Sequence, residues 1–290
     1  MFEGVHTALV TPFRGGTVDE VALRQLVERQ VEAGVDGIVP CGSTGEAATL
    51  SHAEHRRVVE VVVEAARGRV QVVAGTGSNN TTEAIALTRH AKEAGADGAL
   101  LISPYYNKPT QRGIVEHFAA IARASAFPLL VYNIPGRTAS NILPETMGRL
   151  SELEQVVGVK EACGDLHQIS QAILACGPDF TFLSGDDAMT LPLLAVGGHG
   201  VITTVGNLVP TEMVDLVRSF KRGDTEQARR LHQRLLPLID AVFCETNPIP
   251  VKAAVAMQGL ISEEIRLPLT TLSEENRERL RLIMKEFGLL

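Results

Sequence analysis

The chain has 290 residues, of which 45% are hydrophobic, and a formal net charge of −7 at pH 7. That length suffices for one large core, since a single α/β barrel uses about 250 residues. Aromatic residues make up only 4% and no basic block is present, which excludes a typical nucleic-acid-binding surface. No apolar run approaches the roughly 18 residues of a membrane span, and the N-terminus lacks the features of a signal peptide. We therefore expect a cytoplasmic protein with no nucleic-acid or membrane partner.

Short apolar runs alternate with longer helical patterns through about the first 220 residues. The runs are nearly continuous stretches of Val, Ile, Leu and Ala, as expected for strands that are buried on both faces. They begin near Val5, Gly37, Val70, Gly98, Pro128, Val156, Phe180 and Gly200. Segments with helical spacing lie between them, for example at residues 18–33, 51–67, 81–93 and 111–124. This alternation predicts eight strand–helix units.

Eight such units predict a (β/α)8 TIM barrel of the α/β class. A repeat supports them, because Glu-Ala-Gly-Val-Asp-Gly at residues 32–37 returns as Glu-Ala-Gly-Ala-Asp-Gly at residues 93–98, with Gly after each helix end. A doubly wound open sheet is the alternative, which the lack of a Gly-x-Gly-x-x-Gly turn disfavours.

The end of the chain adds more helix without a Gly/Ser linker before it. Helical patterns cover residues 225–244, 248–259 and 273–287. We expect the barrel to span residues 1–224 and a C-terminal helical extension to span residues 225–290, packed on the barrel as one domain.

Unusual residues gather at the predicted carboxyl ends of the strands, which form the working face of such barrels. Lys160 is the only one of six lysines that ends an apolar run, and burial would lower the ordinary amine pKa of about 10.4 and favour a nucleophile. The alternative is a lysine that extends to solvent or pairs with a carboxylate. Tyr105, Tyr106 and Tyr132 follow the fourth and fifth runs and supply phenols. An amine near phenols indicates carbonyl chemistry.

Two further patterns are candidate anion sites. The turn Gly42-Ser43-Thr44-Gly45-Glu46 offers hydroxyls and backbone N–H groups that suit a carboxylate, although a purely structural turn is equally open. Arg137 could hold a second carboxylate, or form a surface ion pair. The eight histidines lack metal-ligand spacing and the four cysteines form no Cys-x-x-Cys pair, so we expect no metal site and free thiols in a reducing cytosol.

Seven motifs in chain order resemble one enzyme superfamily. They lie at residues 7–13, 42–46, 103–107, 132–138, 159–162, 183–187 and 247–252. This pattern is similar to the pyruvate-dependent class I aldolases, which include dihydrodipicolinate synthases and N-acetylneuraminate lyases. The resemblance covers the whole chain and is greatest to the dihydrodipicolinate synthases.

The resemblance implies the catalytic roles. Lys160 would form a Schiff base with pyruvate, so that no separate cofactor is needed. Tyr132 would donate and accept the protons above the imine. Ser43 and Tyr106 would relay protons to solvent, with Tyr106 reaching in from a neighbouring subunit.

The resemblance also implies the substrates. Thr44, Gly185 and the backbone of Ile202 would hold pyruvate, and Arg137 would hold the carboxylate of L-aspartate 4-semialdehyde. Condensation of the two would give 4-hydroxy-tetrahydrodipicolinate, on the route to diaminopimelate and lysine.

One departure bears on the choice within the superfamily. Many synthases have Thr where this chain has Ser43, and Gly-Ser-Thr-Gly-Glu is also usual in neuraminate lyases. Arg137 favours the synthases, because the lyases do not place Arg after Tyr-Asn-Ile-Pro. Another pyruvate-dependent aldolase, such as a neuraminate or sugar-acid lyase, stays open. A non-catalytic keto-acid sensor should have lost Lys160 or Tyr132, and this chain keeps both.

The resemblance extends to regulation and assembly. Synthases that lysine inhibits bind it at a subunit interface, and the family is usually a homotetramer built as a dimer of tight dimers. Glu83 would pair with the ammonium of L-lysine and Asn79 would bind its backbone groups. The matching effector positions are Ala48, His52, His55, Asn79, Glu83 and Tyr105.

Overall fold

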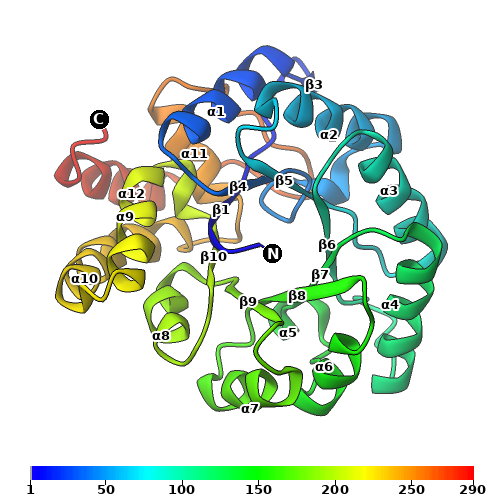
Figure 1. Ribbon diagram of the computed structural model, residues 1–290. Helices are drawn as coiled ribbons and strands as arrows, with labels where there is room; N and C mark the ends of the chain where they lie inside the picture. Colours follow the sequence, from blue (N-terminus) through cyan, green and yellow to red (C-terminus); the bar gives the residue numbers. More distant parts are fainter. Residues whose placement is uncertain (1) are drawn as a thin grey trace.

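All eight expected apolar runs form parallel strands in the computed structural model, which describes residues 2–290 (Figure 1). Strand β1 pairs with both β10 and β4, so the sheet closes into a barrel and the prediction of a (β/α)8 TIM fold is confirmed. The barrel strands are β1 (Gly4–Ala8), β4 (Gly37–Val39), β5 (Gln71–Gly75), β6 (Gly98–Ile102), β7 (Leu129–Asn133), β8 (Val156–Glu161), β9 (Thr181–Ser184) and β10 (Gly200–Thr203).

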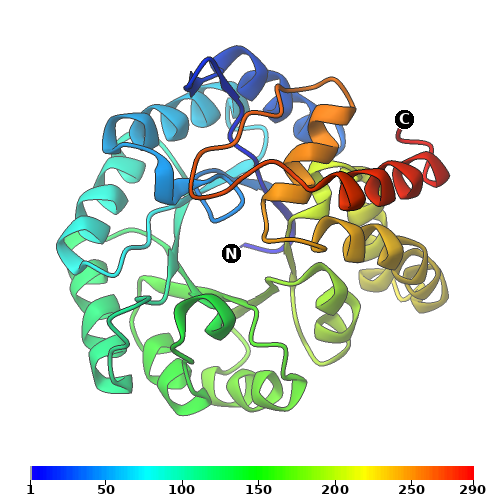
Figure 2. The same cartoon turned by 180° about the vertical axis from the view of Figure 1, so that it is seen from behind.

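Helices form an outer ring around this barrel, as both views of the chain show (Figure 1, Figure 2). Several of them begin after a polar cap, such as Asp19, Asn80 or Thr110, and Ser51 and Glu54 form a reciprocal capping box at the first turn of α2. The four helical segments predicted between strands are each confirmed to within two residues. The ring contains α1 (Glu20–Glu32), α2 (His52–Ala66), α3 (Thr81–Glu93), α4 (Gln111–Ser125), α6 (Pro144–Ser151), α7 (Leu166–Cys176), α8 (Thr190–Ala195) and α9 (Pro210–Lys221). The single-turn α5 (Pro135–Thr138) follows β7 and lies inside this ring (Figure 1).

Several short elements decorate the ends of the strands. The hairpin of β2 (Phe13–Arg14) and β3 (Thr17–Val18) was not expected from the sequence, because two residues a side are too few to show an alternating pattern. Three single-turn 3₁₀ helices follow β4, β9 and β10, namely η1 (Ala47–Thr49), η2 (Asp187–Met189) and η3 (Val205–Asn207).

The barrel interior is a separate apolar cluster from the layer between strands and helices. Phe2 lies at its N-terminal end, where its ring abuts Gly98; a Cβ at that glycine would come within 2.6 Å of the ring. Tyr132 and Ile202 belong to the same cluster near the carboxyl ends of β7 and β10. Side chains therefore fill the barrel interior, as in other barrels of this class.

The C-terminal extension consists of α10 (Thr225–Val242), α11 (Ile249–Met257) and α12 (Glu274–Glu286). Helix α10 packs against α9, and α12 packs against α10 and α11, on one side of the barrel (orange to red in Figure 2). We propose that residues 225–290 extend the barrel rather than form a second domain. No helix within residues 2–290 has the length and apolar character to cross a membrane.

A buried ion pair joins the extension to the barrel. The Lys252 ammonium of α11 contacts the Glu46 carboxylate of the β4 turn, and each side chain is only 1% exposed. The backbone N–H of Arg266 donates to the other Glu46 oxygen at 3.1 Å. The Phe13 ring lies between two cations, with Lys252 Nζ and the Arg266 guanidinium carbon each 4.1 Å from its centroid.

We predict that breaking this pair on one side destabilises the fold. Lys252→Met leaves a buried carboxylate without its counter-ion, which should cost about 3–5 kcal/mol of unfolding free energy. Urea unfolding followed by circular dichroism measures this loss. Lys221→Met is the control, because it removes an exposed pair with Glu3 and should cost about 1 kcal/mol or less. Adding Glu46→Gln to Lys252→Met should recover part of the loss; equal losses from Lys252→Met and the control would contradict the interpretation.

Candidate active site

Lys160 and Tyr132 face each other at the carboxyl ends of neighbouring strands. The register of β7 and β8 places them side by side, and Lys160 Nζ lies 4.4 Å from the centroid of the Tyr132 ring. Gly185, just after β9, packs against the lysine stem: a Cβ there would lie 3.0 Å from Lys160 Cγ and Cε. Gly185 therefore leaves the room that the lysine occupies, which is why the smallest residue is needed there.

Burial changes the chemistry of the amine. Lys160 is 6% exposed, and this desolvation lowers its pKa to about 8, partly opposed by the nearby Asp187 carboxylate. Within residues 2–290, no carboxylate lies at ion-pair distance from the Lys160 amine. A larger fraction of the amine is thus neutral near pH 7 than in an exposed lysine, which favours nucleophilic attack on a carbonyl carbon.

Burial shifts the pKa of the neighbouring phenol in the opposite direction. Burial raises the pKa of Tyr132 above its ordinary value, while the positive charge of Arg137 opposes this effect. At neutral pH the phenol therefore carries its proton. A protonated phenol next to a nucleophilic amine can donate a proton to a leaving oxygen and take one back later.

Two cavities open beside this pair. A small one of about 60 Å³ is lined by Lys160, Tyr132, Ser43, Thr44 and Gly185, among others. A larger one of about 520 Å³ shares Ser43, Tyr132 and Arg137 with it. The structure thus brings together most of the residues that the resemblance implicated in catalysis and pyruvate binding.

Two of those residues lie elsewhere. Ile202 is 1% exposed in the barrel interior and lines neither cavity, although its neighbour Thr204 lines the small one. Tyr106 is 88% exposed, has a backbone φ of 70° and lines neither cavity of its own chain. Any role of Tyr106 in catalysis therefore requires a second copy of the chain.

Five of the six predicted effector residues line the larger cavity. His52 Nε2 lies 2.7 Å from Glu83 Oε1, and Ser78 donates to the other Glu83 oxygen. The His55 ring lies 2.8 Å from the Gly75 carbonyl oxygen. Asn79 does not line the cavity, but its amide donates to the Tyr105 carbonyl at 3.2 Å. The lining residues of this set are Ala48, His52, His55, Glu83 and Tyr105.

Sequence reasoning gave no role to three polar residues that the structure places at the site. Asp187 is 2% exposed and accepts hydrogen bonds from the backbone N–H groups of Thr204 and Val205, at 3.0 and 2.9 Å. Burial raises its pKa. It fixes the chain after β10; in the sequence, its position after the strand that forms β9 and its place in the motif at residues 183–187 were the signals for it.

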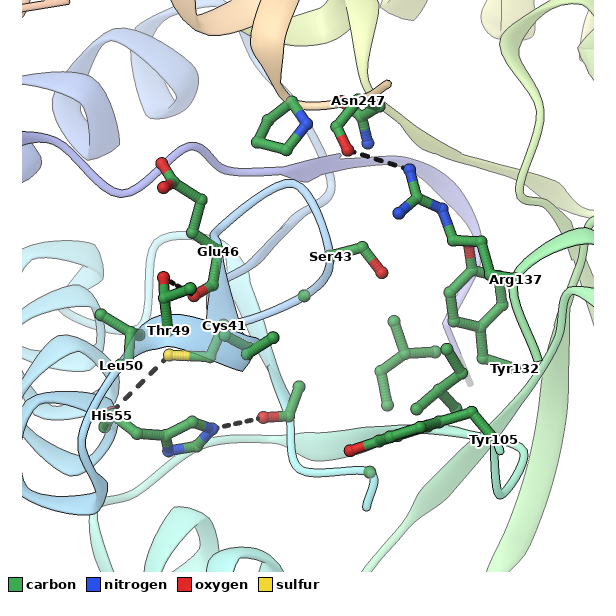
Figure 3. Close-up of a pocket in the computed structure, with 18 of the residues that line it drawn as sticks. Cys41, Ser43, Glu46, Thr49, Leu50, His55, Tyr105, Tyr132, Arg137 and Asn247 are labelled. Atoms are coloured by element: carbon green, nitrogen blue, oxygen red, sulfur yellow. Dashed lines mark hydrogen bonds between the residues drawn. The ribbon is translucent and has the colours of Figure 1, made fainter. Parts of the chain in front are cut away.

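The other two are Glu46, described above, and Asn247. Figure 3 shows Asn247 above Ser43 and next to Arg137, which donates to the Asn247 carbonyl at 2.9 Å. The Asn247 amide donates to Thr44 Oγ1 at 3.0 Å. Asn247 lies in one of the recognised motifs, but nothing in its sequence context indicates contact with residues 203 positions away. Among residues 2–290, no cluster of three His, Cys, Asp or Glu side chains is arranged to hold a metal ion.

A family model described as "Dihydrodipicolinate synthetase family" matches residues 1–287. The chain belongs to this family. A 4-hydroxy-tetrahydrodipicolinate synthase of Nitratidesulfovibrio vulgaris (strain DP4) is 58% identical over 100% of this chain and 99% of its own length. One of Syntrophus aciditrophicus (strain SB) is 54% identical over 100% of both chains. The expected enzyme class, a Schiff-base-forming lyase, is confirmed by these relatives.

Solved structures of the family are nearly superimposable on this chain. Dihydrodipicolinate synthase from Aquifex aeolicus has a TM-score of 0.98 at 48% identity over 99% of both chains. The chloride-inhibited synthase from Acinetobacter baumannii, solved with pyruvate, has a TM-score of 0.98 at 43% identity over 100% of both chains. The lysine-bound enzyme from Cyanidioschyzon merolae has a TM-score of 0.97 at 43% identity, over 100% of this chain and 99% of that one.

We predict that Lys160→Met stabilises the fold at pH 7. On folding, the pKa of Lys160 falls from 10.5 to about 8, so the folded state binds the proton less tightly than the unfolded chain. The resulting penalty is complete below pH 8 and disappears as the pH rises to 10.5. Its size corresponds to about 3 kcal/mol at pH 7.

Urea unfolding at a series of pH values checks this expectation. The gain from Lys160→Met should shrink steadily between pH 8 and pH 10. The exposed Lys221, replaced by Met, is the matched control and should show no such trend. A gain from Lys160→Met that is independent of pH would mean that it arises from packing rather than from the charge.

Proposed function

We propose that this protein condenses pyruvate with L-aspartate 4-semialdehyde through an imine on Lys160, producing 4-hydroxy-tetrahydrodipicolinate for diaminopimelate and lysine biosynthesis. The observation that carries the assignment is the buried Lys160 amine beside the Tyr132 phenol, at the mouth of a cavity that Thr44 and Arg137 also line. Its relatives at 54% and 58% identity are named for this reaction.

The first half of the reaction activates pyruvate. The neutral Lys160 amine attacks the keto carbon, and the keto oxygen leaves as water after Tyr132 supplies a proton. The protonated imine withdraws electrons, so that a methyl proton of pyruvate can leave and an enamine forms. The desolvated position of Lys160 favours both the neutral amine at the start and its release at the end.

The second half forms the new carbon–carbon bond. The enamine carbon attacks the aldehyde carbon of the semialdehyde, and the aldehyde oxygen takes up a proton to become the hydroxyl. The amine of the bound product then attacks the imine carbon, which closes the ring and expels the Lys160 amine. Tyr132 serves as the proton donor and acceptor in these transfers.

The surrounding groups hold the two carboxylates. Thr44, which lines the small cavity, binds the carboxylate of pyruvate, and Gly185 leaves space beside the imine. Arg137 binds the carboxylate of the semialdehyde with its planar guanidinium. This second carboxylate site favours the semialdehyde over the sugar-acid substrates of neuraminate lyases.

Proton relay and assembly are linked in this proposal. Ser43 lines both cavities and passes protons between Tyr132 and a Tyr106 from a neighbouring subunit. The 88% exposure of Tyr106 in a single chain supports this arrangement. We accordingly assign a homotetramer, a dimer of dimers, in which each tight dimer completes two sites.

The same proposal covers the cofactor requirement and the cellular compartment. The covalent imine makes a separate cofactor unnecessary. The four cysteines are free, and three of them are partly exposed, which suits a reducing cytoplasm.

Borohydride reduction in the presence of pyruvate tests the imine. Trapping should add the reduced three-carbon acid to Lys160 in the wild type, as read by peptide mass analysis, and none to Lys160→Met. Steady-state assays should show turnover of pyruvate with L-aspartate 4-semialdehyde and no cleavage of N-acetylneuraminate. An unmodified Lys160 would refute the proposed mechanism, and turnover of the sugar acid alone would refute the substrate.

We further propose L-lysine as a feedback inhibitor bound by Glu83, His52, His55, Asn79, Ala48 and Tyr105, which the lysine-bound relative supports. Glu83→Gln should weaken inhibition by about 10- to 100-fold, the loss of one charge-assisted hydrogen bond, with kcat within about twofold of wild type. Inhibition titrations with millimolar L-lysine measure this effect. Glu93→Gln, at the other end of α3, is the control and should leave inhibition unchanged. A wild-type enzyme that millimolar lysine does not inhibit would remove the effector site.

A further inference from the structure

Asn247 joins the groups proposed to hold the two substrate carboxylates. It lies between α10 and α11, is 8% exposed, and lines both cavities. Its side-chain amide donates to Thr44 Oγ1 at 3.0 Å, and its backbone carbonyl accepts from Arg137 Nη2 at 2.9 Å. Figure 3 shows the Arg137 contact at the rim of the larger cavity. One residue of the extension thus contacts both the turn after β4, across the barrel from Lys160, and helix α5, which follows the neighbouring strand β7.

The contact with Thr44 has a direction. A threonine hydroxyl has one proton to donate and two lone pairs that accept. When the Asn247 N–H occupies a lone pair, the hydroxyl proton is left for another acceptor. If an acceptor stood in place of that N–H, Thr44 would give its proton to residue 247 instead of to a substrate. The 3% exposure of Thr44 means that water does not easily substitute for either partner.

We propose that Asn247 is a positioning residue that points the Thr44 hydroxyl proton at the carboxylate of pyruvate and holds the Arg137 guanidinium in place for the second substrate. This inference rests on the proposed function, because it names how that site orients its two carboxylate-binding groups. Asn247 does not touch the reacting atoms; it acts through Thr44 with its side chain and through Arg137 with its backbone.

The two contacts can be separated by substitution. Changing the side chain removes the donor to Thr44 but keeps the backbone carbonyl that Arg137 contacts. A side-chain variant should therefore weaken the binding of pyruvate and leave the binding of the semialdehyde nearly unchanged. If Asn247 were merely structural, its substitution would weaken the binding of both substrates, since a displaced segment would also displace Arg137.

Asn247→Leu is the first variant, because it preserves volume and removes the donor. The Asn247 carbonyl oxygen Oδ1 has no hydrogen-bond partner within residues 2–290, so an apolar side chain breaks only the hydrogen bond to Thr44. We expect KM for pyruvate to rise about 5- to 10-fold, the loss of one neutral hydrogen bond, and KM for the semialdehyde to stay within about twofold. Asn247→Ala makes the same test if the Leu variant does not fold.

A double-mutant cycle identifies Thr44 as the intermediary. Thr44→Val alone should raise KM for pyruvate. Adding Asn247→Leu to Thr44→Val should then change KM for pyruvate by less than about twofold. Asn247→Asp should weaken the binding of pyruvate more than Asn247→Leu does, because a carboxylate accepts the Thr44 proton and repels the substrate anion. Asn276→Leu is the control: it removes an amide donor from α12, and its acceptor Glu245 keeps two hydrogen bonds from Ser273.

Each result decides the matter. Additive losses in the double variant, or equal rises in both KM values for Asn247→Leu, would overturn the inference. Borohydride trapping at graded pyruvate concentrations distinguishes a failure of this inference from a failure of the proposed function. If wild-type Lys160 is not trapped, the proposed function fails. If wild type and Asn247→Leu are trapped at the same pyruvate concentration, only the role of Asn247 fails.

Discussion

Burial disfavours the charged form of a lysine, and a carboxylate in contact with the amine offsets this effect. Within residues 2–290 two lysines are buried, one with such a contact and one without. Lys252 is 1% exposed and contacts Glu46 directly, so its charge is balanced and it serves to join two parts of the chain. Lys160 is 6% exposed, and the negative charge of Asp187 only partly offsets the lowering of its pKa by desolvation. The first arrangement stabilises a fold, and the second prepares an amine to attack a carbonyl.

The closed parallel barrel explains why the reactive groups meet. Its strands all point the same way, so residues that follow β4, β7, β8 and β9 reach one rim although they are far apart in the chain. The register between β7 and β8 then sets Tyr132 against Lys160. The small cavity beside Lys160 and the larger cavity beside Glu83 share Ser43, Tyr132 and Arg137 as lining residues.

The sequence predicted the parts of this arrangement that depend on local pattern. Each barrel strand is buried on both faces, so an apolar run marks it, and residues after such a run lie at the working rim. Lys160 and Tyr132 were found in that way. Lys252 was not, because a lysine in a helix is ordinarily exposed; its burial depends on Glu46, 206 positions earlier. Asn247 and Thr44 are likewise joined only by tertiary structure, and the role proposed for Tyr106 requires a second chain.

The same long-range contacts show what the C-terminal extension contributes. Its helices were expected to cover the barrel, and α10 does pack on α9. The segment that begins α11 also supplies the counter-ion of Glu46 and the donor to Thr44, both in the turn after β4. Without residues 225–290, Glu46 would be a desolvated carboxylate without a partner, and the Thr44 hydroxyl and the Arg137 guanidinium would each lose a hydrogen bond. The barrel rim carries the reactive amine and phenol, whereas the binding geometry around them is fixed by the part of the chain that follows the barrel.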